Sequence, residues 1–177
     1  SVDNTGRLQF SLGLEPGNGK YQFRRALAQL LVGGGFTEVM NVSITKDKYY
    51  EEKEGLVLIN NTSNTAQNVM RPDLLHPILE NLRYNCTRQM SDLKVFEFGR
   101  VYSRAGDELE EQEQLILAMT GKRFAENWTN PEAPPVDIYD ITGVLQAMFS
   151  KYDISAVLAP IDGPHDLFHP AFQFTVN

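Results

Sequence analysis

Two arginines and a glutamate lie close together within the run Phe96-Glu97-Phe98-Gly99-Arg100-Val101-Tyr102-Ser103-Arg104-Ala105. A guanidinium group is always charged and presents a planar fork of donors, which suits it to holding a phosphate. The same residue types can instead form a structural ion pair that fixes two elements in register. For Glu97 and Arg100 we favour the structural role, or a role in an interface, over nucleotide recognition.

Other reactive residue types occur without the partners that chemistry needs. Arg71 precedes a helical pattern, where it could bind a phosphate or serve equally well as a capping or surface residue. His165 and His169 have the spacing of two ligands on a helix, but nearby prolines disfavour a helix and no third ligand is evident. Cys86 has no evident base, so we expect an idle thiol. We predict no metal site.

Composition predicts one globular domain over residues 1–177. The chain is 42% hydrophobic and 22% charged, has one cysteine and carries a net charge of −7. A lone cysteine fits a reducing compartment, and neither a membrane-length apolar run nor a signal-peptide pattern is present, so we expect a cytoplasmic protein without membrane contact. The negative charge disfavours autonomous capture of nucleic acid, so any RNA contact must be local or shared with a partner.

The first part of the chain predicts a helix, a stop and a strand. Apolar residues at helical spacing predict a helix over 21–32, and the glycines at 33–35 end it. A strand over 36–44 follows. Thr45 is expected to cap a short helix reaching Tyr50, and a short strand over 55–59 precedes a polar loop over 60–68.

The second part predicts two more helices and several strands. The apolar pattern from Leu74 to Leu82 indicates a helix, with Pro72 near its first turn. The motif strand covers 94–102, and the acidic run 107–113 is expected to form a solvated turn to a strand over 115–119 buried on both faces.

A loop over 130–135, a helix beginning near Asp137 and Asp140, and strands over 154–159 and 172–176 complete the pattern. The order of elements favours an α+β fold in which a mostly antiparallel sheet is flanked by helices.

Several blocks resemble the β subunit of bacterial phenylalanyl-tRNA synthetase, from about Tyr21 to Phe174. Met70-Arg71-Pro72-Asp73-Leu74-Leu75, then Leu79-Glu80-Asn81, Asn85 and residues 96–102 follow the family's Met-Arg-Thr-Ser-Leu-Leu, Leu-x-Asn, Asn and Phe-Glu-Ile-Gly-Arg-x-Phe. Residues 136–143 and 168–170 resemble two further family blocks. This chain differs in having Pro72-Asp73 for Thr-Ser and Ala171-Phe172 where the family usually has Gly-Arg or Gly-Gln.

The resemblance implies a class II aminoacyl-tRNA synthetase-like core without catalytic residues. In the class II motif, an arginine that grips the α-phosphate of ATP and a glutamate that helps to position the nucleotide follow the block at 96–102. Here Ser103 and Ala105 occupy those two positions. The motif residues that we expect to be structural are Arg71, Asn81, Glu97, Gly99 and Arg100.

The resemblance also implies partners. The complete enzyme is expected to be an α2β2 heterotetramer that uses ATP and magnesium to charge tRNA(Phe), with catalysis in the α subunit and no cofactor in this chain. The first helix and strand correspond to the motif that builds subunit interfaces in such enzymes. The residues expected at that interface, or in the core beneath it, are Phe23, Leu27, Leu31, Phe36 and Met40.

Three further hypotheses concern the chain as a whole. It stops within a strand pattern at Asn177, which we interpret as a fragment of a longer polypeptide. A second hypothesis is an independent class II-like ligase, in which an arginine such as Arg104 binds phosphate. A free-standing interaction or regulatory module derived from a synthetase is the other alternative.

Overall fold

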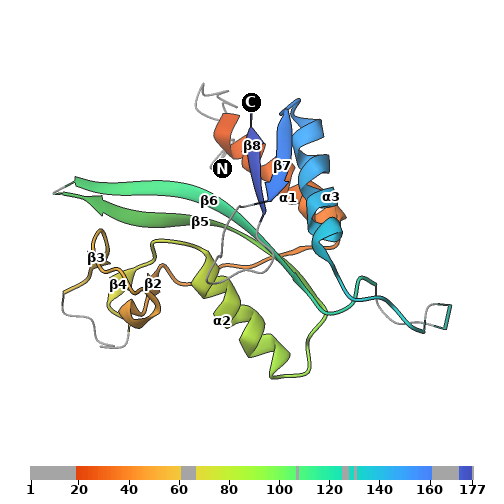
Figure 1. Cartoon of the computed structure of the whole chain (residues 1–177), viewed down its shortest axis with the longest axis horizontal. Helices are drawn as coiled ribbons and strands as arrows, with labels where there is room; N and C mark the ends of the chain where they lie inside the picture. Colours follow the sequence, from red (N-terminus) through yellow and green to blue (C-terminus); the bar gives the residue numbers. More distant parts are fainter. Residues whose placement is uncertain are drawn as a thin grey trace, which may run out of the picture.

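A long antiparallel hairpin organises the fold (Figure 1). The computed structural model describes residues 19–60, 67–106, 108–124, 128–129, 131–160 and 172–176. The hairpin consists of β5 (Leu93–Ala105) and β6 (Glu108–Thr120), which pair along their whole lengths. The short strand β1 (Thr37–Glu38) runs parallel to the start of β5, which gives the sheet order β1-β5-β6. The predicted pairing of the motif strand with the following apolar strand is confirmed.

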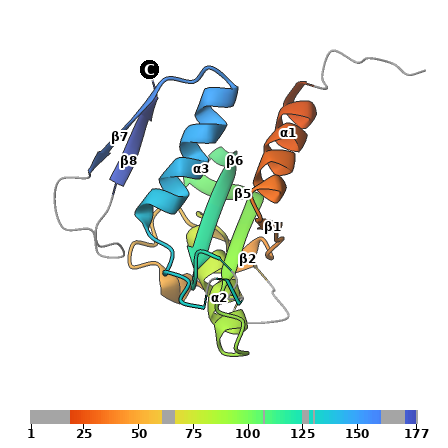
Figure 2. The same cartoon turned by 90° about the vertical axis from the view of Figure 1, so that its right-hand side faces the viewer.

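Two helices pack on one face of the hairpin, while a third lies on the opposite side (Figures 1 and 2). Helices α1 (Gly19–Gly33) and α3 (Ile138–Lys151) bury apolar residues against β5 and β6, and α2 (Leu75–Cys86) lies beyond the other face. The core cluster consists of Leu27, Leu31, Phe36, Phe96 and Met148. The three helices lie where apolar spacing predicted them.

The start of α3 and the end of α1 are fixed by local sequence. The Asp137 side chain accepts hydrogen bonds from the amides of Tyr139 and Asp140, and the Asp140 side chain accepts one from the Asp137 amide. This reciprocal capping box satisfies amides that the helix itself cannot pair. After α1, Gly35 has a φ of +85°, a conformation that glycine adopts without steric cost.

Two smaller sheets complete the described residues. Strands β2 (Ile44–Thr45), β4 (Val69–Met70) and β3 (Val57–Leu58) form an antiparallel sheet in the order β2-β4-β3, with a 3-10 turn, η1 (Asp47–Tyr49), after β2. Strands β7 (Ala156–Pro160) and β8 (Phe172–Val176) pair antiparallel to one another. The architecture is α+β and rich in antiparallel pairs, as predicted from the sequence.

The expected continuous strand over 36–44 is wrong. The chain pairs with β5 at Thr37–Glu38, leaves that sheet, and then pairs with β4 at Ile44–Thr45. Between the two, the Asn41 amide donates to the Glu97 carboxylate instead of to a neighbouring strand. An apolar, β-branched run does not reveal which sheet will supply each hydrogen-bond partner.

Expectations about two helix starts are also corrected. Thr45 does not cap a helix, because it is a buried residue of β2 and η1 begins only after Lys46. Pro72 lies before α2, whereas Pro77 occupies the first turn of that helix. The backbone amides of Leu75 and His76 donate hydrogen bonds to the Asp73 side chain. Asp73 thus supplies acceptors for amides at the start of α2 that have no partner within the helix.

The acidic run is a strand rather than a turn. The hairpin reverses near Gly106, with a φ of +63°, and the acidic residues from Glu108 onward pair in register with β5. The apolar residues at 115–119 are only partly buried, with Leu115, Leu117 and Met119 packed against the core cluster, so the expected full burial on both faces is wrong. Cys86 is exposed.

Candidate functional site

A buried ion pair joins the segment after β4 to the middle of β5. Arg71 and Glu97 are 3% and 1% exposed, and Arg71 Nη1 lies 2.6 Å from Glu97 Oε1. The sequence singled out both residues but did not bring them together, and it treated Arg71 as a phosphate, capping or surface residue. A buried charge is tolerated only when it is paired and hydrogen-bonded, so the pair depends on its surroundings.

Asn41 and the β5 backbone supply further hydrogen-bond partners to this pair. Arg71 donates from Nε to the Arg100 carbonyl at 2.9 Å and from Nη1 to the Asn41 carbonyl at 3.3 Å. Asn41 donates to Glu97 twice, from its amide to Oε1 at 3.3 Å and from Nδ2 to Oε2 at 2.7 Å. The segment that crosses between the two sheets is thus tied to β5 by side-chain hydrogen bonds.

Two asparagines of α2 extend the network. Asn81 Nδ2 donates to Asn41 Oδ1 at 3.1 Å, and Asn85 Nδ2 donates to Asn81 Oδ1 at 3.0 Å. The resemblance to the family's blocks singled out Asn81 and Asn85, but nothing in the sequence marked Asn41 as their partner. The network therefore joins four segments: the residues after β4, strand β5, the stretch around Asn41 and helix α2.

Gly99 makes room for the Arg71 guanidinium. A Cβ at this position would lie 2.3 Å from Arg71 Nη2 and 2.6 Å from Leu74 Cδ2. Leu74 is 2% exposed, so neither neighbour has free space to move into. Gly99 is required here by close approach and not by an unusual backbone angle.

The surface around Ser103 and Ala105, the two positions at which the class II motif has an arginine and a glutamate, is acidic in this chain. Ser103 and Ala105 are exposed near the tip of the hairpin and pair in register with Glu110 and Glu108. The Ser103 hydroxyl donates to Glu110 Oε2 at 3.5 Å. A shallow cavity of about 480 Å³ beside them is lined by Pro72, Val101, Ser103, Glu110, Glu111, Gln112 and Gln114. That lining contains two carboxylates and no basic side chain, which opposes the binding of a phosphate.

The two remaining arginines of the motif are engaged elsewhere. Arg104 alternates with Ser103 along β5, and its Nε donates to the Gly106 carbonyl at 2.9 Å. Arg100 Nη1 lies 3.0 Å from Glu111 Oε1, and its Nε lies 4.0 Å from Glu113 Oε1. Both Arg100 pairs cross from β5 to β6 on the surface, where such pairs add little stability.

The five expected interface or core residues divide into two groups. Leu27, Leu31 and Phe36 are buried in the core cluster. Phe23 is 44% exposed on α1, and Met40 is 93% exposed just before the crossing segment. Other exposed apolar residues of this region are Tyr21, Val32 and Val42. Phe23 and Met40 therefore lie at the surface, whereas the other three residues form the core.

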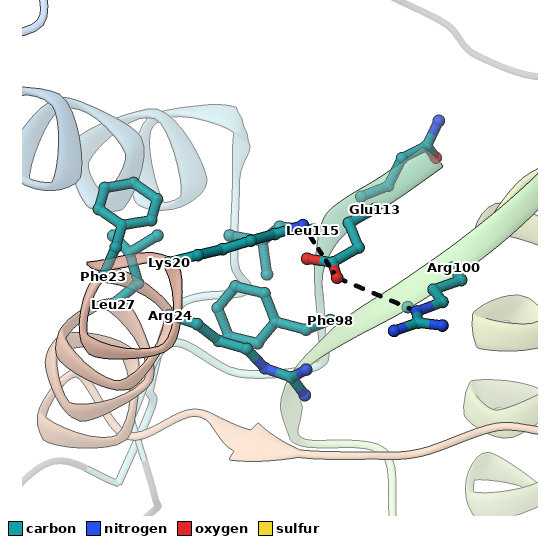
Figure 3. A pocket seen from close by; sticks show the side chains of 10 residues that line it. Lys20, Phe23, Arg24, Leu27, Phe98, Arg100, Glu113 and Leu115 are labelled. Atoms are coloured by element: carbon teal, nitrogen blue, oxygen red, sulfur yellow. Dashed lines mark ion pairs between the residues drawn. The ribbon is translucent and has the colours of Figure 1, made fainter. Parts of the chain in front are cut away.

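A pocket of about 400 Å³ opens between α1 and the hairpin (Figure 3). Its apolar lining residues are Phe23, Leu27, Phe98 and Leu115, and its charged ones are Lys20, Arg24, Arg100 and Glu113. The Arg24 guanidinium lies 4.9 Å from the centre of the Phe98 ring. The sequence predicted the stripe of α1 but not this pocket, because its two walls are about 80 residues apart.

A second charged cluster fastens η1 to α2. Lys46 Nζ donates to Glu80 Oε1 at 2.8 Å, and the Tyr49 hydroxyl donates to the same oxygen. The hydrogen bond from Lys46 holds the pKa of Glu80 below its usual value. Burial of the neighbouring Tyr50 hydroxyl raises the pKa of that phenol. These contacts position η1 against α2.

The described residues contain no group of three or more His, Cys, Asp or Glu side chains arranged for a metal ion. His165 and His169 lie outside the described residues. None of the described helices is long and apolar enough to cross a membrane. At the start of α3, the Asp137 amide and then Arg123 hold the pKa of Asp140 below its usual value, which stabilises a capping box rather than preparing an acid for catalysis.

Residues 9–177 match the family described as "Phenylalanyl tRNA synthetase beta chain CLM domain". The chain is 33% identical over 166 residues to the phenylalanine–tRNA ligase beta subunit of Geobacter sulfurreducens, covering 88% of this chain and 21% of that protein. It is 34% identical over 144 residues to the corresponding subunit of Bacteroides thetaiotaomicron, covering 73% of this chain and 17% of that protein. The chain thus spans about a fifth of the length of such relatives.

Among solved structures, the chain resembles Desulfitobacterium hafniense PylSc, a pyrrolysyl tRNA synthetase. The TM-score is 0.61, with 15% sequence identity, and the match covers 89% of this chain and 54% of the other. At that identity the likeness establishes the fold alone, which is the class II synthetase fold that the sequence predicted.

Proposed function

This chain belongs to the phenylalanyl tRNA synthetase beta chain CLM domain family, and we propose that it is the catalytically silent core of a β subunit. It packs against a catalytic α subunit in an α2β2 enzyme of the cytoplasm. That enzyme uses ATP and magnesium to join phenylalanine to tRNA(Phe), while this chain holds neither cofactor. The chain is one domain, residues 1–177, of a longer β polypeptide, which the length of its relatives supports.

The single observation that supports a silent role is that the described residues lining the cavity beside Ser103 include acidic side chains and no arginine. An adenylate-forming site must neutralise phosphate oxygens, and arginine does so through fixed positive charge. Here Ser103 and Ala105 pair with Glu110 and Glu108 on β6. The negative charge of a bound phosphate would therefore be repelled by carboxylates. The nearby guanidinium of Arg71 is held by Glu97 and is not available to a ligand in its place.

The interface role is supported by the division of apolar residues along α1 and the segment after it. Leu27 and Leu31 face the core, whereas Phe23 and Met40 leave apolar surface in solvent. Large apolar side chains left in solvent on α1 and on the chain after it are candidates for contact with a partner. Arg71, Glu97 and Asn41 hold the segment behind Met40 against β5, so this surface is presented by a fixed backbone.

Co-expression of this protein with the α subunit of the same organism tests the proposal. We expect a complex by light scattering, with ATP–pyrophosphate exchange by preparations that contain the α subunit and none by this protein alone. Exchange by this protein alone would establish an independent ligase. A monodisperse protein that binds no α subunit would instead favour a free-standing module.

A surface variant refines the same experiment. Met40→Asp places a charge on the exposed apolar surface and is expected to weaken the complex about tenfold or more, because an unpaired charge would be buried there. Leu109→Asp makes the same change at a residue of the hairpin that is 63% exposed, and serves as the matched control. Equal affinity for both variants would place the interface elsewhere.

A further inference from the structure

The pocket between α1 and the hairpin combines an apolar floor with a cationic rim. Phe98 and Leu115 form the floor on the sheet side, and Phe23 closes it from α1 (Figure 3). Lys20 and Arg24 project from the first turns of α1, while Arg100 approaches from β5. A cavity of about 400 Å³ is large enough for one or two side chains of a partner.

The charges of the lining favour an anionic guest. Three cations and one carboxylate line the pocket, in a chain whose net charge is −7. Two of the cations also meet glutamates outside the lining: Arg24 lies 3.5 Å from Glu38, and Arg100 lies 3.0 Å from Glu111. The side chains of the three cations are 49% to 74% exposed, so their ion pairs can exchange partners at small cost.

Glu113 already places a carboxylate at the mouth of the pocket. Its Oε1 lies 3.1 Å from Lys20 Nζ and 4.0 Å from Arg100 Nε, and Figure 3 shows these two pairs converging on one oxygen. The geometry therefore demonstrates that a carboxylate fits between α1 and β5 at this point. An acidic side chain from outside can take the same cations if Glu113 turns toward solvent.

We propose that this pocket anchors the α subunit, by receiving an acidic side chain together with an adjacent apolar one. The inference rests on the proposed function and adds the chemistry of the contact. The acidic group displaces Glu113 from Lys20 and Arg100, and the apolar neighbour packs on Phe98 and Leu115. Charge complementarity selects this occupant, because the three exposed cations of the lining attract an acidic side chain and repel a basic one, and a purely apolar segment makes no use of their charge.

Charge variants of this protein, measured as dissociation constants for the α subunit, test the anchor. Lys20→Glu with Arg24→Glu reverses two rim charges and is expected to weaken binding at least tenfold. Glu113→Gln removes the competing carboxylate and is expected to tighten binding about threefold, a direction that mere damage to the fold cannot produce. Arg83→Glu with Arg88→Glu, both exposed on or just after α2, is the matched double reversal and is expected to change binding less than twofold.

The salt dependence of binding and site-specific cross-linking show whether the pocket holds the α subunit, a second copy of this chain or residues 1–18. Wild-type affinity should fall with added salt, and the Lys20/Arg24 double variant should show a shallower dependence. A benzoylphenylalanine cross-linker in place of Gln114, which also lines the pocket, should capture an α-subunit peptide in which an acidic residue adjoins an apolar one. Capture of a second copy of this chain, or of its own residues 1–18, would overturn the proposal.

Failure of the anchor is separable from failure of the proposed function. If the α subunit binds wild type and all variants equally, the interface role stands and the pocket anchor is wrong. If Glu113→Gln weakens binding as much as the rim reversals do, the Glu113 carboxylate itself contacts the α subunit. The proposal that an acidic group displaces Glu113 is then wrong. If the wild-type protein binds no α subunit, both the proposed interface role and the proposed anchor are wrong.

Discussion

Replacing Gly99 by alanine tests whether close approach at β5 maintains the buried ion pair. The added methyl group would lie 2.3 Å from Arg71 Nη2 and 2.6 Å from Leu74 Cδ2, far inside contact distance. Forcing an extra carbon into a packed site costs about 1–3 kcal/mol. Moving the guanidinium away would strand the Glu97 carboxylate, and breaking a buried pair costs about 3–5 kcal/mol. We expect the free energy of unfolding to fall by about 3 kcal/mol.

Urea unfolding followed by circular dichroism measures this change, with Gly143→Ala as the control. Gly143 lies inside α3, and a Cβ there would meet no atom within 4 Å. That variant should gain about 0.5–1 kcal/mol, because alanine favours a helix over glycine. An unfolding free energy for Gly99→Ala within about 0.5 kcal/mol of wild type would refute the packing argument.

Three further predictions concern the buried ion pair, the capping box of α3 and the contact between Lys46 and Glu80. Glu97→Gln should lower the free energy of unfolding by about 3 kcal/mol, and a double-mutant cycle with Arg71→Met should show coupling, since additive losses would mean that the pair is not a unit. Asp137→Ala should cost about 1 kcal/mol and lower the melting temperature, whereas Asp137→Asn should retain most of the cap. The folded pKa values of Glu80 and Asp140 lie below their ordinary values of 4.5 and 3.8, so their stabilisation is present above those values and lost as pH falls through the folded ones. Glu80→Gln should therefore flatten the fall in melting temperature below about pH 4, and an unchanged profile would contradict this.

Local patterns were enough to predict the three helices and the motif strand, because the causes of those elements are local. The apolar spacing of α1, the aspartates at the start of α3 and the apolar and aromatic residues of the motif strand each contain the information that forms them. The resemblance to the family's motif blocks likewise marked Arg71, Asn81, Glu97, Gly99 and Arg100 as structural residues, without showing which of them meet. The absence of the expected arginine and glutamate was also visible in the sequence, at Ser103 and Ala105.

The tertiary structure alone decided how these residues meet. Arg71 pairs with Glu97, 26 positions away, and Asn41 joins them from a segment that the sequence assigned to one continuous strand. The acidic run became half of a hairpin because β5 supplied its hydrogen-bond partners, a choice that no local pattern encodes.

The pocket between α1 and β6 likewise exists only because two distant segments pack side by side. Local sequence sets backbone preference and amphipathic faces. The pairing of buried charges and the shape of cavities depend on which faces meet, and that is settled by the packing of the whole chain.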